Sequence, residues 1–423
     1  MIVVQKVTPG STLLRNLLSM SMVQAVNVLL PIITFPYLIR VLGFEQFGLV
    51  NYALALVIFF VVFVDFGYNL TGTRDVAAVR GDSRALSALF STKLTAQALL
   101  LLIASLLFIA LVFAVPKLQR DWLIYMLTFG LVPATMLLPT WYFQGTEQFP
   151  LLARLQLTGR GVYALGIFTL VKSPVDSWLV PLLNSGTGFL IALVGMWHIL
   201  RRDRLGLSWP GVAQSLASLR QGTGVFASSF AVTAYNYSAL LILGSLGNDR
   251  LVGQFAAIEK ILLLFRSGLS ALFAVIFPRT CQLAAGGPAA SAAFLRRVFR
   301  WLLPALLAVG VVLIALAAPV LRLVVGSSDP GLVVLLSWMA WIPLLLGINM
   351  PSYQQLLAHR QKRSYTVVLI SAAACSIVLN LVLAPLYGPL GTAWAVLFAE
   401  VVIAFGLLYA TEVQYRQLSV WRR

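Results

Sequence analysis

Long apolar stretches recur along the whole chain, and short segments between them hold most of the charged residues. A helix that spans a membrane needs about 20 mostly apolar residues. Twelve stretches meet this requirement and predict twelve spanning helices, namely 16–39, 47–70, 86–114, 122–144, 150–171, 177–200, 222–245, 252–278, 298–324, 331–356, 365–386 and 389–411. The first stretch has no small-residue cleavage site after a short apolar core, so we expect it to be an uncleaved spanning helix.

Composition excludes a soluble globular domain. Of the 423 residues, 60% are hydrophobic and only 10% are charged, and the mean hydropathy is +0.93, far above the range of soluble domains. The net charge of +17 would fit nucleic-acid binding if the basic residues formed a continuous stripe, but they lie in short loops between apolar segments. We therefore predict an all-α integral membrane protein with no nucleic-acid partner.

The basic residues predict the orientation of the chain. Most of them fall in every second loop, including the tail around Lys6 and Arg15, the segment around Arg201 and Arg202, and the end around Arg416. Positive loops mark the cytoplasmic side of a membrane. This predicts a multi-pass protein of the cytoplasmic membrane with both termini in the cytoplasm. The loops on the opposite side are short, so we expect the functional groups to lie among the helices.

A weak internal repeat indicates duplication. Residues 42–53, LGFEQFGLVNYA, match residues 246–257, LGNDRLVGQFAA, with one inserted position. The first copy joins predicted helices 1 and 2 and the second joins helices 7 and 8. This predicts two six-helix halves, 1–205 and 222–423, joined by a cytoplasmic connector, 206–221. Halves related by an axis along the membrane normal are typical of transporters, with a central cavity between them.

Motifs for catalysis are missing from the sequence. It contains no HExxH, CxxC, P-loop or nucleophile-elbow pattern. His198 and His359 stand beside arginines near the ends of predicted helices, and Cys281 and Cys375 have no metal-ligand spacing. We predict that the chain is not an enzyme and has no cofactor and no metal site.

Charged residues within predicted helices are the strongest candidates for function, because each costs at least ~2.5–3.5 kcal/mol on insertion. In IEKILLLFR, residues 258–266, Glu259 and Arg266 are two turns apart and share a helix face, and Lys260 lies about 100° away. One interpretation is a cavity wall that attracts an anion. The other is an ion pair that only packs helices.

Other charges extend this set of candidates. Asp65 lies in a predicted helix end, and Glu400 is the lone acid of the last helix. A carboxyl in apolar surroundings favours its neutral form, so Glu400 could carry a proton or be a neutral structural acid. The candidate cations are Arg40, which could instead snorkel to the interface, Arg74, Arg154 and Arg160.

Aromatic residues account for 11% of the chain. They include Trp141, Tyr142 and Phe143 together with Trp301, Trp338 and Trp341. Aromatic side chains are enriched at both membrane–water interfaces. We therefore expect most of this set to form an interfacial belt.

Several motifs resemble one family when taken in order. These are Asn27 with PYLIRVLGFEQFG, the Asp65-Phe66-Gly67 stretch with Arg74, PTWYFQGTEQF, and YGPLGTAWAVLFAE at 387–400. Together they resemble the polysaccharide transporter family, the Wzx-type O-antigen flippases of the multidrug/oligosaccharidyl-lipid/polysaccharide superfamily. The resemblance runs over nearly the whole chain.

The resemblance implies a MATE-like fold and a carrier that moves undecaprenyl-pyrophosphate-linked sugar repeat units from the cytoplasmic to the outer leaflet by alternating access, driven by proton exchange. It also implies that the protein contacts membrane lipids and works beside polysaccharide polymerase and ligase partners. The family's cationic cavity would fit Arg40, Arg74, Arg154, Arg160, Lys260 and Arg266, since arginine suits phosphate; Asp65, Glu259 and Glu400 are the proton-coupling candidates. The alternatives are a cation-coupled multidrug exporter and a lipid II flippase of the same superfamily.

Overall fold

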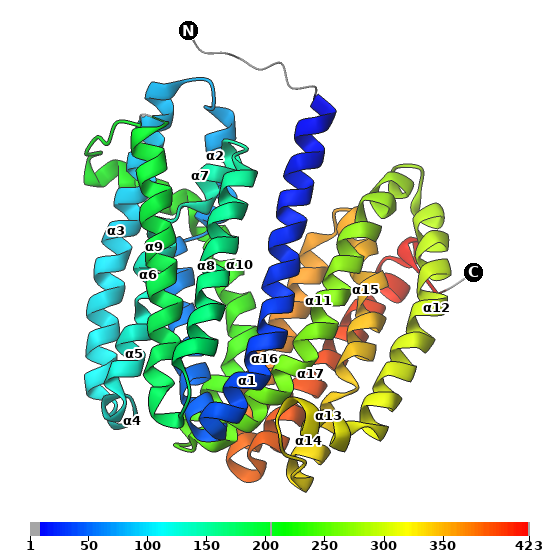
Figure 1. Ribbon diagram of the computed structural model, residues 1–423. Coiled ribbons are helices and arrows are strands. Elements are labelled where there is room, and N and C mark those ends of the chain that lie inside the picture. Colours follow the sequence, from blue (N-terminus) through cyan, green and yellow to red (C-terminus); the bar gives the residue numbers. More distant parts are fainter. Residues whose placement is uncertain (1–8, 204, 422–423) are drawn as a thin grey trace. The chain divides into compact units, whose positions relative to one another are not determined.

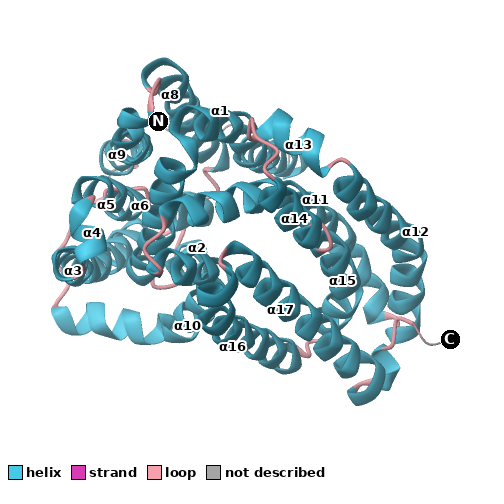
Figure 2. Ribbon diagram, turned by 90° about the horizontal axis from the view of Figure 1, so that it is seen from below, coloured by secondary structure: helices cyan, strands magenta, loops and turns pink. Residues whose placement is uncertain are grey.

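The computed structural model describes residues 9–203 and 205–421, where the regular elements are helices joined by short loops (Figures 1 and 2). The first half of the chain forms α1 (Pro9–Asp65), α2 (Tyr68–Ala78), α3 (Ser83–Ala114), α4 (Pro116–Arg120), α5 (Trp122–Phe129), α6 (Leu131–Leu137), α7 (Thr140–Gly145), α8 (Phe149–Leu170), η1 (Pro174–Trp178) and α9 (Leu179–Arg201). The rest forms α10 (Val212–Ser245), α11 (Asp249–Ala285), α12 (Pro288–Ala315), α13 (Ala317–Val324), α14 (Pro330–Met339), α15 (Ile342–Ala358), α16 (Lys362–Tyr387), α17 (Pro389–Tyr409), η2 (Ala410–Gln414) and η3 (Arg416–Leu418).

Ten helical stretches in the described part of the chain are long and apolar enough to cross a membrane. The first of them, Met22–Ala78, covers most of the predicted span 16–39 and all of 47–70, and the helix bends between the two at Gly43, where φ is 71°. The predicted span at 150–171 is α8, whose 22 residues include Arg154 and Arg160 and are therefore more polar. Each of the twelve predicted spans thus corresponds to a helix or to consecutive helices, and the predicted fold class is confirmed.

The predicted span at 122–144 is broken into α5, α6 and α7. The breaks fall at Gly130 and at Leu138–Pro139, where both residues leave the helical conformation. Proline at such a site has no backbone N–H to donate to the preceding turn. The broken backbone faces a cavity described below, which is where interrupted membrane helices are tolerated.

Two compact units are defined by the contacts within the chain. Unit 1 comprises Met1–Leu42 and Tyr52–Thr233, and unit 2 comprises Gly43–Asn51 and Ala234–Arg423. The short segment 43–51, which makes up most of the first copy of the repeat, therefore clusters with the second copy in unit 2. The division into halves at 206–221 and the cytoplasmic position of both termini stay predictions.

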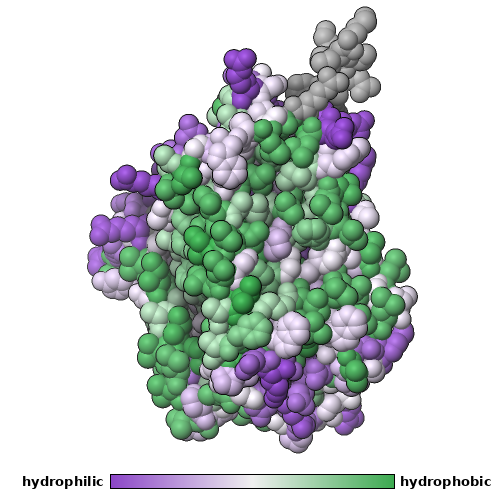
Figure 3. All heavy atoms as spheres, turned by 90° about the vertical axis from the view of Figure 1, so that its left-hand side faces the viewer, coloured by the Kyte–Doolittle hydropathy of each residue, from purple (hydrophilic) through white to green (hydrophobic). Residues whose placement is uncertain are grey.

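The outer faces of the helices carry large apolar side chains. Examples are Leu102 and Leu106 on α3 and Leu190 and Trp197 on α9, each about 60% exposed. The face of the molecule in Figure 3 has hydrophobic side chains across its middle and hydrophilic ones gathered toward its upper and lower ends. Water would penalise such a surface at about 25 cal/mol per Å², whereas lipid tails do not, so the surface fits a membrane protein.

Three aromatic residues contradict the expectation of an interfacial belt. Trp141, Tyr142 and Phe143 are at most 1% exposed and form part of the core of unit 1. Trp141 packs 5.7 Å from the ring of Phe90, and a Cβ on Gly72 of α2 would lie 3.0 Å from the indole. The belt interpretation is therefore wrong for these three, because the short helix α7 packs inward against α2. Trp301 and Trp338 are exposed, and for them the belt stays a prediction.

The two copies of the sequence repeat share a backbone conformation. Gly43 and Gly247 occupy equivalent places after a leucine, and their φ angles are 71° and 83°. Glycine adopts this left-handed region without the steric cost that other residues meet. In both copies the glycine ends one helical segment and lets the next begin in a new direction.

The second glycine of each copy lies against the other copy. A Cβ added to Gly48 would lie 1.9 Å from the carbonyl oxygen of Asp249 and 2.6 Å from the nitrogen of Gly253. A Cβ added to Gly253 would lie 1.9 Å from the carbonyl oxygen of Phe44. The contact is reciprocal, so the motif recurs because two helix beginnings cross at backbone distance and only glycine fits on either side.

Candidate functional site

A cavity of about 470 Å³ lies inside unit 2. Five helices supply its walls: α10, α11, α15, α16 and α17. Its charged residues are Arg266 from α11 and Glu400 from α17. The fold thus brings together two predicted site residues that are 134 positions apart. The other lining side chains used below are Tyr235, Asn349, Phe273, Tyr353 and Tyr365.

Glu400 is 2% exposed and accepts two hydrogen bonds. The hydroxyl of Tyr235 donates to Oε1 at 2.8 Å, and the amide Nδ2 of Asn349 donates to Oε2 at 3.3 Å. The amide oxygen Oδ1 of Asn349 has no partner. Turning this amide over would let it accept from a protonated Glu400, because its oxygen and nitrogen nearly exchange places. The side chain of Asn349 can therefore serve both protonation states.

Arg266 faces the same cavity with an unsatisfied donor. Its Nε atom is buried and has no hydrogen-bond partner. Its positive charge acts on both Glu400 and Glu259. A buried guanidinium with an unused N–H is a ready donor for an anion, since planar N–H forks match phosphate and carboxylate oxygens.

An aromatic wall borders the charged pair. The ring of Phe273 stacks on that of Tyr353 with centroids 5.1 Å apart and an interplanar angle of 24°, and Tyr353 lies 4.5 Å from Tyr365. Offset aromatic pairs of this kind hold one another in place. They give the cavity an aromatic side.

Glu259 and Lys260 also lie on α11, and both are half-buried. They act on each other electrostatically, but neither is among the side chains that line the 470 Å³ cavity. Of the cluster predicted at 258–266, the structure therefore joins only Arg266 to Glu400.

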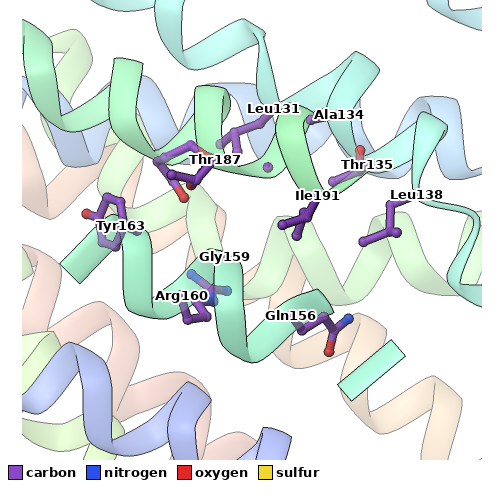
Figure 4. Close-up of a pocket in the computed structure, with 12 residues that line it drawn as sticks. Leu131, Ala134, Thr135, Leu138, Gln156, Gly159, Arg160, Tyr163, Thr187 and Ile191 are labelled. Atoms are coloured by element: carbon purple, nitrogen blue, oxygen red, sulfur yellow. Dashed lines mark hydrogen bonds between the residues drawn. The ribbon is translucent and has the colours of Figure 1, made fainter. Parts of the chain in front are cut away.

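Unit 1 contains two adjoining cavities of about 190 and 200 Å³. Thr135, Leu138 and Gln156 line both. Arg160 lines the first cavity and Asp65 lines the second. Because the two cavities adjoin, they connect two more of the predicted site residues. Figure 4 shows the first cavity, with side chains contributed by α6, α8 and α9.

The carboxyl of Asp65 has a local structural partner. It accepts hydrogen bonds from the backbone N–H groups of Gly67 and Asn69 at the start of α2. Unsatisfied N–H groups at a helix start favour a nearby carboxylate. Asp65 therefore shapes the turn between α1 and α2 as well as lining the cavity.

The remaining predicted cations lie elsewhere. The side chain of Arg74 is 74% exposed and pairs with Asp75 at 2.9 Å. Arg40 and Arg154 are exposed. None of these three lines the cavities described above.

One buried ion pair was not predicted. The ammonium of Lys93 on α3 is 3.0 Å from Asp75 on α2, and the Lys93 side chain is 3% exposed. It also lies 4.4 Å from the ring centroid of Tyr68. A lysine within an apolar helix requires such a partner, so its place in the sequence was a usable signal, although the identity of the partner was not.

In the part of the chain that the structure describes, no three His, Cys, Asp or Glu side chains are grouped closely enough to hold a metal ion. His359 lies at the end of α15, 3.5 Å from Ser291 Oγ. Burial lowers the pKa of its imidazole, which keeps the ring neutral at pH 7.

Solved structures place the fold among membrane transporters. A multidrug resistance MATE family transporter of the MOP superfamily, in an inward-facing conformation, matches with a TM-score of 0.72 and 15% identity, over 92% of this chain and 95% of that one. The lipid II flippase MurJ, in an inward closed conformation, matches with a TM-score of 0.66 and 15% identity, over 95% and 88%. The fold is MATE-like, as predicted.

The sequence comparisons identify the family. Residues 13–284 match the family described as "Polysaccharide biosynthesis protein", so the chain belongs to it. A protein of Escherichia coli (strain K12) named "Putative O-antigen transporter" is 25% identical over 93% of this chain and 95% of its own length. A protein of the same name from Shigella dysenteriae is 26% identical over 64% and 67%. The chain is a multi-pass membrane transporter and not an enzyme.

Proposed function

We propose that this protein flips undecaprenyl-pyrophosphate-linked sugar repeat units from the cytoplasmic to the outer leaflet of a bacterial inner membrane, with both termini in the cytoplasm. The observation that carries the proposal is the relative from Escherichia coli, whose name describes an O-antigen transporter and which matches almost end to end. Polymerase and ligase enzymes of a glycan pathway would act on the product.

Arginines that face cavities would hold the anionic head group. Arg266 offers a buried Nε–H that has no partner, and Arg160 lines the first cavity of unit 1. A pyrophosphate presents several oxygens in the geometry that a guanidinium matches. The other predicted cations would act at other stages of transport, either by attracting the head group from a distance or by contacting it at the membrane interface. They are Lys260, Arg40, Arg74 and Arg154.

Proton exchange at Glu400 would drive the cycle. In the ionised state the carboxylate accepts from Tyr235 and Asn349, and in the protonated state it would donate to the turned amide of Asn349. Arg266 faces the same cavity, so neutralising Glu400 frees the guanidinium to hold an anion. Glu259 and Asp65 remain the other proton-coupling candidates. Coupling of this type requires two conformations that differ in their affinity for substrate and for proton. Alternating access of the two halves would supply two such conformations.

The charge balance of the cavities distinguishes glycolipid flipping from the alternative functions. A multidrug exporter for organic cations needs acids in excess, whereas the unit 2 cavity holds one arginine for its one acid. A lipid II flippase of the same superfamily would more often carry two helices beyond twelve. We therefore favour glycolipid flipping over both of these alternative functions.

A substrate panel tests the proposal. Purified protein in liposomes would be supplied in parallel with a fluorescent undecaprenyl-pyrophosphate oligosaccharide, with lipid II and with a cationic dye. We expect translocation of the oligosaccharide lipid to exceed that of lipid II at least about tenfold, a difference of about 1.4 kcal/mol, with no dye efflux. Faster movement of lipid II, or dye efflux without glycolipid movement, would assign the protein to another branch of the superfamily.

A further inference from the structure

The two adjoining cavities of unit 1, called the unit 1 chamber here, are lined by apolar and uncharged polar side chains in about equal number. Besides Arg160 and Asp65 at its two parts, the chamber is lined by four amide side chains, several threonines and one indole; they are Asn69, Gln97, Gln156, Asn184, Thr135, Thr140, Thr187 and Trp141. Polar groups within membrane-spanning helices are costly unless they have partners. Some of these groups have partners within the chain, as Thr140 has in Asn69 and Thr187 in Leu183, so the groups that have none are the ones available to a ligand.

Two of these side chains are deeply buried and have an unsatisfied atom. Gln97 is 3% exposed and its Oε1 accepts no hydrogen bond. Trp141 is 1% exposed and its Nε1–H donates none. Both line the 200 Å³ part of the chamber. One free acceptor and one free donor at the same part of the chamber match a group that donates and accepts at once, as a hydroxyl does.

Charge decides which ligand class fits. A pyrophosphate needs several cations, and the chamber offers only Arg160. An organic cation needs acids, and the single acid Asp65 already accepts from two backbone N–H groups. An uncharged polyol needs many donors and acceptors without net charge, which is what amides supply. Together the two parts reach the lower end of the range of about 300–1,000 Å³ that is typical of small-molecule sites.

We infer that the unit 1 chamber binds a neutral sugar ring of the transported glycan, with Gln97, Trp141 and Gln156 as its specific contacts. The inference deepens the proposed function and rests on it for the source of the sugar. The part of the chamber lined by Gln97 and Trp141 recognises ring hydroxyls, while Arg160, which lines the other part, and the other cationic residues described above are left for the head group.

The test measures binding of free sugar separately from transport. The full chain in nanodiscs would be titrated with a neutral N-acetylhexosamine-containing trisaccharide, and affinity would be read from the rise in Tm with ligand concentration. Gln97→Met and Trp141→Phe each remove one hydrogen-bonding group and should weaken affinity about tenfold. The matched controls are Gln354→Met and Trp394→Phe in unit 2, which also remove a buried polar atom that has no partner, and these should bind like the wild type.

The outcomes are distinguishable. Saturable binding that only the two chamber variants weaken supports the inference, even if the wild type moves no glycolipid, in which case the proposed function alone fails. If the wild type shows no saccharide-dependent change in Tm, or if the controls weaken binding as much as the chamber variants, the inference is overturned. Glycolipid transport by the wild type would then leave the proposed function standing, with the chamber filled by water.

Discussion

Gly253→Ala should destabilise the protein by at least about 3 kcal/mol, the upper end of the usual range for overpacked sites. The added Cβ would lie 1.9 Å from the carbonyl oxygen of Phe44, and backbone atoms cannot rotate away as the end of a side chain can. Gly48→Ala should have an effect of the same size, since its Cβ meets the carbonyl of Asp249. Thermal unfolding of the purified variants, together with glycolipid translocation, measures the effect.

Gly268→Ala is the control for this pair, because Gly268 lies on the same helix α11 and its Cβ would meet nothing within 4 Å. Alanine is also the better helix former, by up to about 1 kcal/mol, so this variant should be at least as stable as the wild type. The double variant Gly48→Ala, Gly253→Ala should lose little more than either single variant, because one displacement of the crossing helices relieves both clashes. Wild-type stability in both single variants would show that the crossing is not a tight contact.

Arg266→Met should lower glycolipid translocation by about 10–150-fold, as expected when a hydrogen bond to a charged group is lost. Methionine preserves much of the apolar stem but removes the guanidinium, including its buried Nε–H that has no partner. Initial rates in proteoliposomes measure the loss. Arg266→Lys should recover part of the activity, since it restores the charge without the planar fork.

Arg279→Met is the matched control on the same helix. Arg279 is exposed and donates to Gln282 at 3.3 Å, so its removal should leave the rate unchanged. A stronger version of the experiment replaces both Lys260 and Arg266 with Ala. Undiminished export by that double variant would exclude a role for this cationic cluster in substrate binding.

The sequence was sufficient to place the helices but not to pair their side chains. Hydropathy locates spans because a bilayer demands about 20 apolar residues, and the repeat at 42–53 and 246–257 pointed to the glycines that cross. It could not show that Trp141 is buried, because lipid-facing and protein-facing positions of a membrane helix are both apolar. A periodic pattern therefore does not reveal which face of α7 packs inward.

The sequence could not identify the partners of the charged groups, for a related reason. Glu400 is held by Tyr235 and Asn349, which are 165 and 51 positions away. Which helices are neighbours, and how each is rotated about its axis, depends on contacts across the whole unit. Depth and charge nominated both Arg266 and Glu400, which line one cavity, yet the same reasoning also nominated Arg74, which is exposed and pairs with Asp75.

Glycolipid translocation under an imposed pH gradient is the measurement that tests the central claim most directly. Wild-type protein and Glu400→Gln would be reconstituted with the fluorescent undecaprenyl-pyrophosphate oligosaccharide, and Glu147→Gln, which alters an exposed pair with Arg80, would serve as the control. We expect the wild type and the control to move the glycolipid faster when the gradient is applied, and Glu400→Gln, fixed in a neutral form, to show no response to it. Equal acceleration of all three proteins would exclude Glu400 as the coupling group, and no glycolipid movement by the wild type under either condition would contradict the account as a whole.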